Sequence, residues 1–265
     1  MVENFNQYKN QIEDKGYAII PPTSEMLSII ESLNNELDKI GEFYVPSFDR
    51  NNPKHTLEAN LKGYYKVIRN SPFQLCEIAT SKTIRILLND LDITFPVIHG
   101  CNVRVDVKEE SHHQFGWHQD AISLLGSRSM FTYWIPLGNV SESRGSIQVI
   151  PYSHLKGIYP VQARDPHLAD ESKSSNLIIT TNINEAESTI IKASAGTIVV
   201  LHPLLVHRSY YPKFIHPPRR TVLLRVDELD DAEHRKLGYK TSAHGFNLIN
   251  SPEYESYYKK IKSKN

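Results

Sequence analysis

Asn102-Val-Arg-Val-Asp-Val107 is the stretch that decides the fold class, because polar and apolar residues alternate along it without interruption. A period of two residues is typical of a β-strand that is buried on one face. Later short runs are rich in β-branched or aromatic residues and are separated by Gly, Pro, Asn and Ser. These runs are 130–137, 146–150, 177–181, 188–192, 197–201 and 221–226. Many short strands in series favour a sandwich or barrel over a doubly wound sheet, so we expect a β core over residues 101–230.

The residues before this core have mainly helical patterns, in which apolar residues recur every three or four positions. The expected elements are a helix over 5–15, a strand over 17–20 and a long helix over 24–40 that ends at Gly41. Ser71 and Ser81 are expected to cap the starts of two further helices, because a serine hydroxyl accepts a hydrogen bond from the first turn. Residues 1–100 therefore predict a mostly helical region that braces the sheet.

The composition indicates one globular unit that can bury a full core without disulfides. Hydrophobic residues make up 40% and charged residues 23% of the chain, which is close to the usual globular mix. We expect residues 1–265 to form a single domain that ends in a C-terminal extension over 231–265. Lys plus Arg and Asp plus Glu are each 30, so the formal net charge is zero and no general attraction to nucleic acid or to an anionic membrane is expected.

The cysteines and the hydropathy pattern predict a cytoplasmic protein. The only two cysteines, Cys76 and Cys101, lack CxxC spacing and are typical of free thiols in a reducing compartment. The N-terminus has no apolar core of a signal peptide, and no apolar run reaches the roughly 18 residues of a membrane span.

Two stretches, 41–66 and 164–187, are polar and weakly periodic. Loops of that length in a compact domain are usually functional or disordered. We therefore expect both stretches to be candidate lids over a site.

Phe115-Gly-Trp-His118-Gln-Asp120 contains a histidine and an aspartate two residues apart. In an extended segment these two side chains point to the same side, so one strand end can supply two metal ligands. A neutral imidazole and a carboxylate suit Fe(II), and a second histidine from a distant strand completes a facial triad that leaves positions open for a co-substrate and O2. The pattern alone is weak, because a histidine of this kind is also found hydrogen-bonded in a protein interior.

The residues alone leave the second histidine and a co-substrate arginine open. His202 and His207 both follow the apolar run 197–201, and either is a candidate for the third ligand. Further on, alternation places Arg219, Thr221, Leu223 and Arg225 on one face of a strand and Arg220 on the other. Only one of the adjacent arginines can face inward, where a guanidinium can hold a carboxylate by a bidentate pair.

Five motifs carry a resemblance to a known family. They are Trp117-His-Gln-Asp120, Tyr133-Trp-Ile-Pro-Leu137, Gly145-Ser-Ile-Gln-Val-Ile-Pro-Tyr-Ser-His154, His202-Pro-Leu-Leu-Val-His207-Arg-Ser209 and Pro218-Arg-Arg220. Over roughly the second half of the chain, the sequence resembles the phytanoyl-CoA dioxygenase-like (PhyH) family of Fe(II)/2-oxoglutarate-dependent oxygenases, which includes ectoine hydroxylase. The resemblance implies a double-stranded β-helix, or jelly roll, whose open end holds the iron.

The resemblance also implies roles for individual residues. His118, Asp120 and His207 match the iron ligands, and Arg219, with help from Ser209, matches the hold on the distal carboxylate of 2-oxoglutarate. Two further co-substrate contacts are expected, Trp134 from a matching family position and Asn102 from a strand near the site. The implied reaction uses O2 to hydroxylate an unactivated C–H bond of a polar small molecule and gives succinate and CO2.

Departures from the family and rival functions stay open. Arg208 and Tyr152 stand where the family often has glycine, and both are expected to border the substrate entrance. Asp120 stands where related halogenases have a small residue, so the resemblance favours hydroxylation over chlorination. The alternatives are a metal-dependent enzyme on the same barrel that does not use 2-oxoglutarate, and a non-catalytic jelly roll that binds a ligand.

Overall fold

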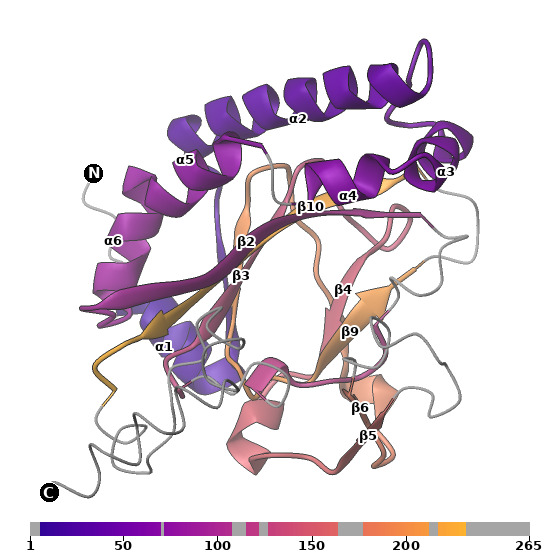
Figure 1. Ribbon diagram of the computed structural model, residues 1–265. Coiled ribbons are helices and arrows are strands. Elements are labelled where there is room, and N and C mark those ends of the chain that lie inside the picture. Colours follow the sequence, from indigo (N-terminus) through magenta and orange to yellow (C-terminus); the bar gives the residue numbers. More distant parts are fainter. Residues whose placement is uncertain are drawn as a thin grey trace, which may run out of the picture.

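Two antiparallel sheets of short strands form the centre of the molecule (Figure 1). The computed structural model describes residues 6–69, 72–107, 115–121, 127–163, 177–211 and 217–231. The five-stranded sheet has the order β1 (Tyr17–Ile20), β8 (Ile198–Leu201), β3 (Phe131–Pro136), β10 (Arg219–Glu228) and β2 (Pro96–Asp106). The three-stranded sheet has the order β7 (Thr189–Ile190), β4 (Ser146–Val149) and β9 (His207–Tyr210), and β5 (Val161–Ala163) pairs with β6 (Leu177–Ile179). Mainly antiparallel sheets with flanking helices confirm the predicted fold class.

The side chains between the two sheets form one core. Trp134 from β3 and Val199 from β8 pack against Ile147 and Val149 from β4 in the smaller sheet. All four side chains are at most 5% exposed, and removing such large apolar groups from water stabilises the fold by roughly 1.5–3 kcal/mol each. This layer fixes the spacing of the sheets, and the open end of that space is where the functional residues gather.

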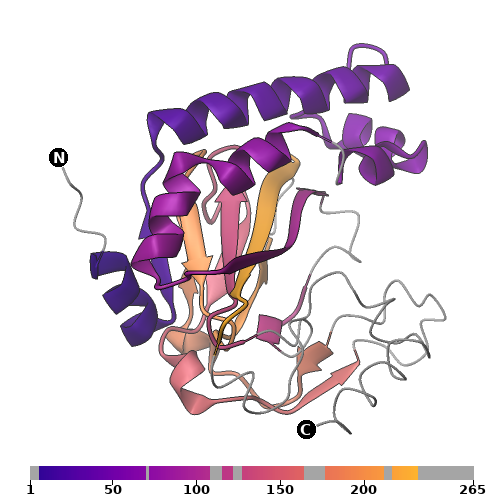
Figure 2. The same cartoon turned by 60° about the vertical axis from the view of Figure 1, so that its left-hand side comes forward.

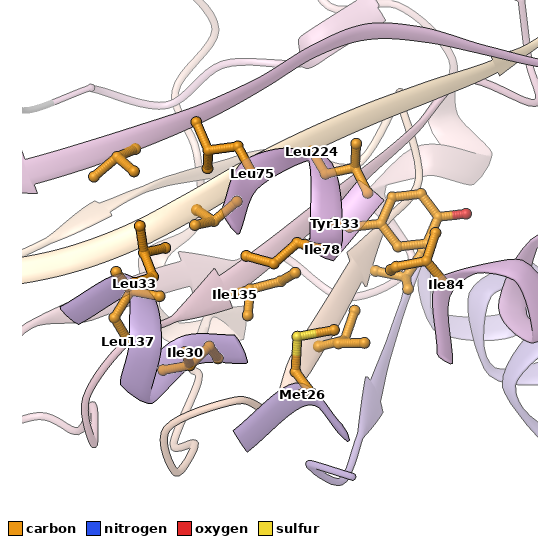
Figure 3. Close-up of a cluster of buried hydrophobic side chains, with 14 of the residues drawn as sticks. Met26, Ile30, Leu33, Leu75, Ile78, Ile84, Tyr133, Ile135, Leu137 and Leu224 are labelled. Carbon is orange, nitrogen blue, oxygen red and sulfur yellow. The ribbon is translucent and has the colours of Figure 1, made fainter. Parts of the chain in front are cut away.

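Helices from the N-terminal region cover the outer face of the five-stranded sheet (Figures 1 and 2). They are α1 (Asn6–Lys15), α2 (Ser24–Tyr44), α3 (Pro53–Leu61), α4 (Tyr64–Ile68), α5 (Gln74–Thr80) and α6 (Lys82–Asp90). Figure 3 shows Met26 and Leu33 of α2 with Ile78 of α5, close to Tyr133 and Ile135 of β3. A second core therefore holds the helices to the sheet, as the periodic apolar pattern predicted.

Side-chain caps begin α2, α3 and α6, and the cap of α3 is the Asn52 side chain, which accepts from the Lys54 N–H (3.0 Å). The Thr23 hydroxyl accepts a hydrogen bond from the Met26 N–H (3.1 Å) at the start of α2. The Ser81 hydroxyl accepts from the Ile84 N–H (3.2 Å) at the start of α6, which confirms the predicted cap. Ser71, the other predicted cap, lies outside the described residues, and α5 begins three residues later at Gln74.

The predicted end of the long helix is wrong. α2 continues through Gly41 to Tyr44, and the N–H of Val45 donates to the Gly41 carbonyl. A Cβ atom at position 41 would lie 2.6 Å from the ring of Phe48. The glycine is therefore there for close packing of an aromatic ring against the helix, not to end it.

The candidate lid over 41–66 is also wrong, because this stretch forms the end of α2 together with α3 and most of α4. Its polarity comes from helices that are buried on one side only, with Ala59 and Tyr64 fully covered. In the other candidate lid, residues 164–176 lie outside the described residues, and 177–187 contains β6 and the 3-10 turn η4 (Glu185–Glu187).

Strand boundaries differ from the prediction where pairing extends a strand. β2 and β10 are longer than the alternating pattern indicated, because they pair with each other from Arg219 opposite Asp106 to Glu228 opposite Pro96. β5 and β9 were not predicted, and they have three and four residues, respectively.

The single-domain division stays a prediction, and positions 232–265 of its C-terminal extension lie outside the described residues. None of the described helices is long and apolar enough to cross a membrane.

Candidate metal centre

His118, Asp120 and His207 converge on one point at the open end of the two sheets. One ligand atom from each side chain lies within 4.8 Å of those of the other two. The N–H of His118 donates to the carbonyl of His207 (2.9 Å), and the N–H of His207 donates back to the carbonyl of His118 (3.0 Å). This isolated bridge holds the two histidines opposite each other, with ring centroids 4.2 Å apart.

The orientation of each imidazole is fixed by a backbone carbonyl two residues earlier. His118 Nδ1 lies 2.8 Å from the Gly116 oxygen, and His207 Nδ1 lies 2.9 Å from the Leu205 oxygen. A carbonyl oxygen only accepts, so Nδ1 carries the hydrogen and Nε2 keeps its lone pair. The Nε2 atoms lie 3.8 Å and 4.0 Å from the Asp120 carboxylate oxygens, too far for hydrogen bonds. The three groups therefore face a shared position as ligands do, with the backbone as the outer support that metal-binding histidines require.

Asp120 is held as a carboxylate by its neighbours. The Thr132 hydroxyl donates to Asp120 Oδ2 (2.6 Å), and Arg225 Nη2 lies 3.8 Å from Oδ1. Burial alone would raise the pKa of Asp120, but the Arg225 guanidinium, both imidazoles and the Thr132 hydroxyl together lower that pKa below its usual range. A buried carboxylate is thus ready to bind a cation.

His118 is neutral near physiological pH. Burial, followed by the nearby His207, lowers the pKa of its imidazole from 6.5 to about 3. A metal ion binds the neutral ring, so no proton has to leave His118 at neutral pH before a metal binds. Two imidazoles and one carboxylate are the donor set expected for Fe(II).

A cavity of about 290 Å³ lies at this cluster. It is lined by the three clustered residues and by side chains from β2, β3, β9, β10 and the 115–118 segment. Among the described residues, its arginines are Arg69, Arg104, Arg208, Arg219 and Arg225, and its carboxylates are Asp106 and Asp120. The wall is therefore more cationic than anionic, although the whole chain is neutral.

Arg219 and Arg220 point to opposite sides of β10. Arg219 lines the cavity, and its guanidinium donates to Asp106 (2.8 Å), to the Tyr211 hydroxyl (3.1 Å) and to the Ser146 carbonyl. Its Nε is buried and has no hydrogen-bond partner in the part of the chain that the structure describes. Arg220 turns toward α2 instead, where it donates to Asp38 (2.8 Å), so it lies outside this cavity.

Of the other residues that the sequence predicted for the site, some line the cavity and some lie outside it. Ser209 and Trp134 line the cavity, and the Ser209 hydroxyl accepts from the Phe115 N–H (3.2 Å). Asn102 is half-buried on β2 and is not among the residues of the cavity wall. His202 lies outside the cluster, where its ring packs against His154 (centroids 4.9 Å apart) and its Nδ1 accepts from the Leu204 N–H.

The two departures from the family are placed differently. Arg208 lines the cavity, but its guanidinium already binds Glu185 through two hydrogen bonds (2.7 Å and 2.9 Å) and lies over the Trp117 ring. Tyr152 is outside the cavity wall, at the start of the 3-10 turn η2 (Ser153–Lys156) with a left-handed φ of 65°. Its backbone takes a conformation that glycine adopts more easily.

Thr132 and Arg225 were not expected as part of the site. Alternation along 219–225 put Arg225 on the cavity side, but it gave no reason to place that side chain beside Asp120. Thr132 was hidden in an apolar run, where a threonine is an ordinary strand residue. Both become recognisable only when β3 and β10 pair, because Arg225 lies directly opposite Thr132.

Comparisons with known proteins agree with this arrangement. The model of the phytanoyl-CoA dioxygenase (PhyH) family matches residues 12–211 of the chain. No curated protein sequence matches the chain.

Several solved structures share the fold at low sequence identity. EvdO2 from Micromonospora carbonacea var. aurantiaca, complexed with 2-oxoglutarate, matches with a TM-score of 0.58 and 16% identity over 89% of this chain and 96% of that one. The epimerase SnoN, in complex with Fe3+, α-ketoglutarate and nogalamycin RO, matches with 0.57 and 16% over 85% and 84%. EctD from S. alaskensis, with 2-oxoglutarate and 5-hydroxyectoine, matches with 0.57 and 13% over 87% and 79%.

Proposed function

Because the chain belongs to the phytanoyl-CoA dioxygenase (PhyH) family, we propose that it is an Fe(II)- and 2-oxoglutarate-dependent dioxygenase that hydroxylates a C–H bond of a polar small molecule. The observation that carries this proposal is the convergence of two imidazoles and one carboxylate in a cavity that is also lined by Arg219, whose buried Nε has no hydrogen-bond partner among the described residues. When bound, Fe(II) and 2-oxoglutarate together supply the activation of O2, with succinate and CO2 as co-products.

The metal fits the donor set. His118 and His207 would bind Fe(II) through Nε2, since each Nδ1 is engaged by a backbone carbonyl. Asp120 would bind through a carboxylate oxygen, while Thr132 holds the other oxygen in place. Three protein donors leave coordination positions for a co-substrate and O2.

The co-substrate fits the Arg219 end of the cavity. A buried donor without a partner is rare in proteins and indicates a missing ligand or water. The Arg219 Nε is such a donor, and Ser209 and Trp134 line the same cavity. Asp106 orients the guanidinium from behind (2.8 Å), and the distal carboxylate of 2-oxoglutarate would bind its free side.

Hydroxylation is favoured over halogenation by Asp120. Its carboxylate occupies the position that a halide would need, and the Thr132 hydroxyl and the Arg225 guanidinium keep it charged and in place. A cytoplasmic location is supported by two free cysteines, Cys76 and Cys101.

The test measures binding and turnover separately. Under anaerobic conditions, wild type should bind Fe(II) and 2-oxoglutarate and develop the visible absorbance of an Fe(II)–keto-acid chelate. With O2 it should convert 2-oxoglutarate to succinate. His118→Ala should lose both signals, whereas His202→Ala should keep them, since His202 lies outside the cluster. Equal signals from wild type and His118→Ala would contradict the proposal.

The rival functions predict different results in the same assay. A metal-dependent enzyme of another type would bind Fe(II) but consume no 2-oxoglutarate, and a non-catalytic jelly roll would form no succinate. An epimerase is the second candidate, because the structural neighbour SnoN is an α-ketoglutarate-dependent epimerase. Hydroxylation adds one oxygen atom to the product mass and epimerisation adds none, so mass spectrometry of the product distinguishes the two.

A further inference from the structure

Arg225 presents an unused cationic donor beside the metal centre. Its Nη2 lies 3.8 Å from Asp120 Oδ1, which is too long for a hydrogen bond. Its Nε is buried and finds no hydrogen-bond partner within the described part of the chain. The side chain lines the cavity and is 22% exposed. A guanidinium in this position is available to a ligand that enters the cavity.

Arg225 serves a different ligand from Arg219. The two residues are at opposite ends of the cavity face of β10, with Thr221 and Leu223 between them in the cavity wall. At about 3.3 Å per residue, their Cα atoms are roughly 20 Å apart along the strand. The Arg219 head group is fixed at its own end by Asp106 and Tyr211. In the proposed complex, the distal carboxylate of 2-oxoglutarate would bind Arg219 and its keto-acid end would bind the metal, so both carboxylates of that molecule are already engaged.

Once a metal ion is bound, the positive charge of Arg225 is no longer balanced by an anionic group of the cavity. Arg104 and Arg219 both lie against Asp106, and Arg208 lies against Glu185. Within the described ranges, the only carboxylate paired with Arg225 is that of Asp120, and a bound metal ion would neutralise the charge of this carboxylate. A partly buried guanidinium beside a dication is costly unless an anion accompanies it. The cavity therefore needs a second anion in addition to 2-oxoglutarate.

We propose that the substrate carries an oxyanion, and that Arg225 binds this group beside the metal. The inference rests on the proposed function, and it narrows the substrate from a polar molecule to an anionic one. The strand geometry gives the oxyanion room, because the residue opposite Arg225 on β2 is Gly100, which has no side chain. A planar guanidinium binds a carboxylate, sulfonate or phosphate through two parallel hydrogen bonds. This pair of hydrogen bonds to Arg225 would fix how far the anionic group of the substrate lies from the C–H bond that is hydroxylated at the metal.

The experiment uses matched anionic and neutral probes. The probes are small carboxylates, sulfonates and phosphate monoesters, each paired with its amide, sulfonamide or parent alcohol. Binding is measured as the shift in Tm of the anaerobic Fe(II)·2-oxoglutarate protein at constant ionic strength. Saturating 2-oxoglutarate keeps the probes away from Arg219. Binding, rather than turnover, is the readout, so a probe need not be a substrate.

Three variants locate the anion site. We expect anionic probes to bind wild type better than their neutral partners, and Arg225→Gln to bind the anions at least about tenfold more weakly. Arg225→Lys should recover part of the binding, because it restores the charge but not the planar pair of donors. Arg69→Gln is the matched control, since Arg69 lines the same cavity but is exposed, and salt screens its charge. It should change anion binding less than threefold.

Each outcome bears on the inference. Equal binding of neutral and anionic partners, the absence of anionic binders, or anion binding that survives in Arg225→Gln would each overturn it. Loss of anion binding in Arg69→Gln but not in Arg225→Gln would also overturn it. Failure of the proposed function is seen separately, as the absence of the Fe(II)–2-oxoglutarate absorbance in wild type before any probe is added. That result removes the premise and overturns both proposals.

Discussion

His118 and His207 donate a backbone hydrogen bond to each other's carbonyl oxygen, at 2.9 Å and 3.0 Å, although they are far apart in the sequence. The two imidazoles that face the proposed metal are thus positioned by the backbone before any ion is present. A preformed site of this kind should bind a divalent ion without large rearrangement, and binding should stabilise the fold.

The first prediction concerns that stabilisation. Adding Fe(II) under anaerobic conditions at about 100 times its Kd should raise the free energy of unfolding by about 2.7 kcal/mol, because the ion binds only the folded chain. Thermal unfolding with and without the ion measures the effect. His207→Ala should unfold at the same temperature in both conditions, while His202→Ala should keep the full shift. A shift of equal size in His207→Ala would show that the ion binds elsewhere.

The second prediction concerns Thr132. Its hydroxyl donates to the Asp120 carboxylate (2.6 Å), and a partner of this kind to a metal ligand typically contributes 10–100-fold to metal affinity. Thr132→Val keeps the shape but removes the donor, so we expect Fe(II) to bind about tenfold more weakly or worse. Thr132→Ser should restore most of the affinity. Unchanged binding in a metal titration of Thr132→Val would mean that this hydrogen bond does not support the site.

The third prediction contrasts two neighbouring arginines. Arg219→Gln should raise the concentration of 2-oxoglutarate needed for half-saturation by at least about tenfold, since it removes a charged partner of a carboxylate. Arg220→Gln should leave 2-oxoglutarate binding unchanged and lower the free energy of unfolding by about 1–3 kcal/mol, because it breaks buried hydrogen bonds to α2. Titration with 2-oxoglutarate measures the affinity of both variants for the co-substrate, and urea unfolding measures their stability. The reverse pattern would assign the co-substrate to Arg220.

The fourth prediction concerns the pH dependence of the metal-free protein. The pKa of His118 is lowered from 6.5 to about 3 on folding, so the unfolded chain binds one more proton than the folded chain between these values. The free energy of unfolding should therefore rise with pH up to about 6.5 and fall as the solution is acidified, by up to about 1.4 kcal/mol per pH unit from this group. The lowered pKa of Asp120 acts with the same sign at lower pH. His118→Gln should show a shallower slope in urea unfolding between about pH 4 and 6.5. Identical slopes would contradict the assignment.

The fifth prediction concerns packing away from the site. Gly41→Ala should destabilise the protein by about 1–3 kcal/mol, because the new Cβ would lie 2.6 Å from the Phe48 ring. The affinity for Fe(II) should not change. Gly138→Ala is the control, since nothing lies within 4 Å of a Cβ at that position. Equal stability of the two variants in urea unfolding would contradict the packing argument.

Local patterns in the sequence were enough for most of the fold. The alternation in β2 and β10 and the apolar spacing in α2 follow directly from which face is buried, so they were readable without any partner. Gly41 was misread because its role depends on Phe48, which approaches the helix from outside. The sequence predicts a loop where α3 and α4 form, because these two helices bury only a narrow side.

The candidate site was predicted where two ligands share a short motif, as in His118-Gln-Asp120. The spacing of the residues did not distinguish His202 from His207, and the family resemblance had to do so. In the structure the difference is the pairing of β9 with β4 and of His207 with His118, which no local pattern reveals. Thr132 and Arg225 depend on the pairing of β3 with β10 in the same way.

β1 pairs with β8 at one edge of the five-stranded sheet, from Tyr17 opposite Leu201 to Ile20 opposite Ile198. A chain shortened by its first twenty residues would leave β8 with a row of unpaired backbone groups on a strand that is otherwise fully apolar. Such an edge is a template for pairing with a second molecule. Truncated forms should therefore self-associate through β8. β1 thus protects the edge of β8 from aggregation, in addition to forming part of the sheet.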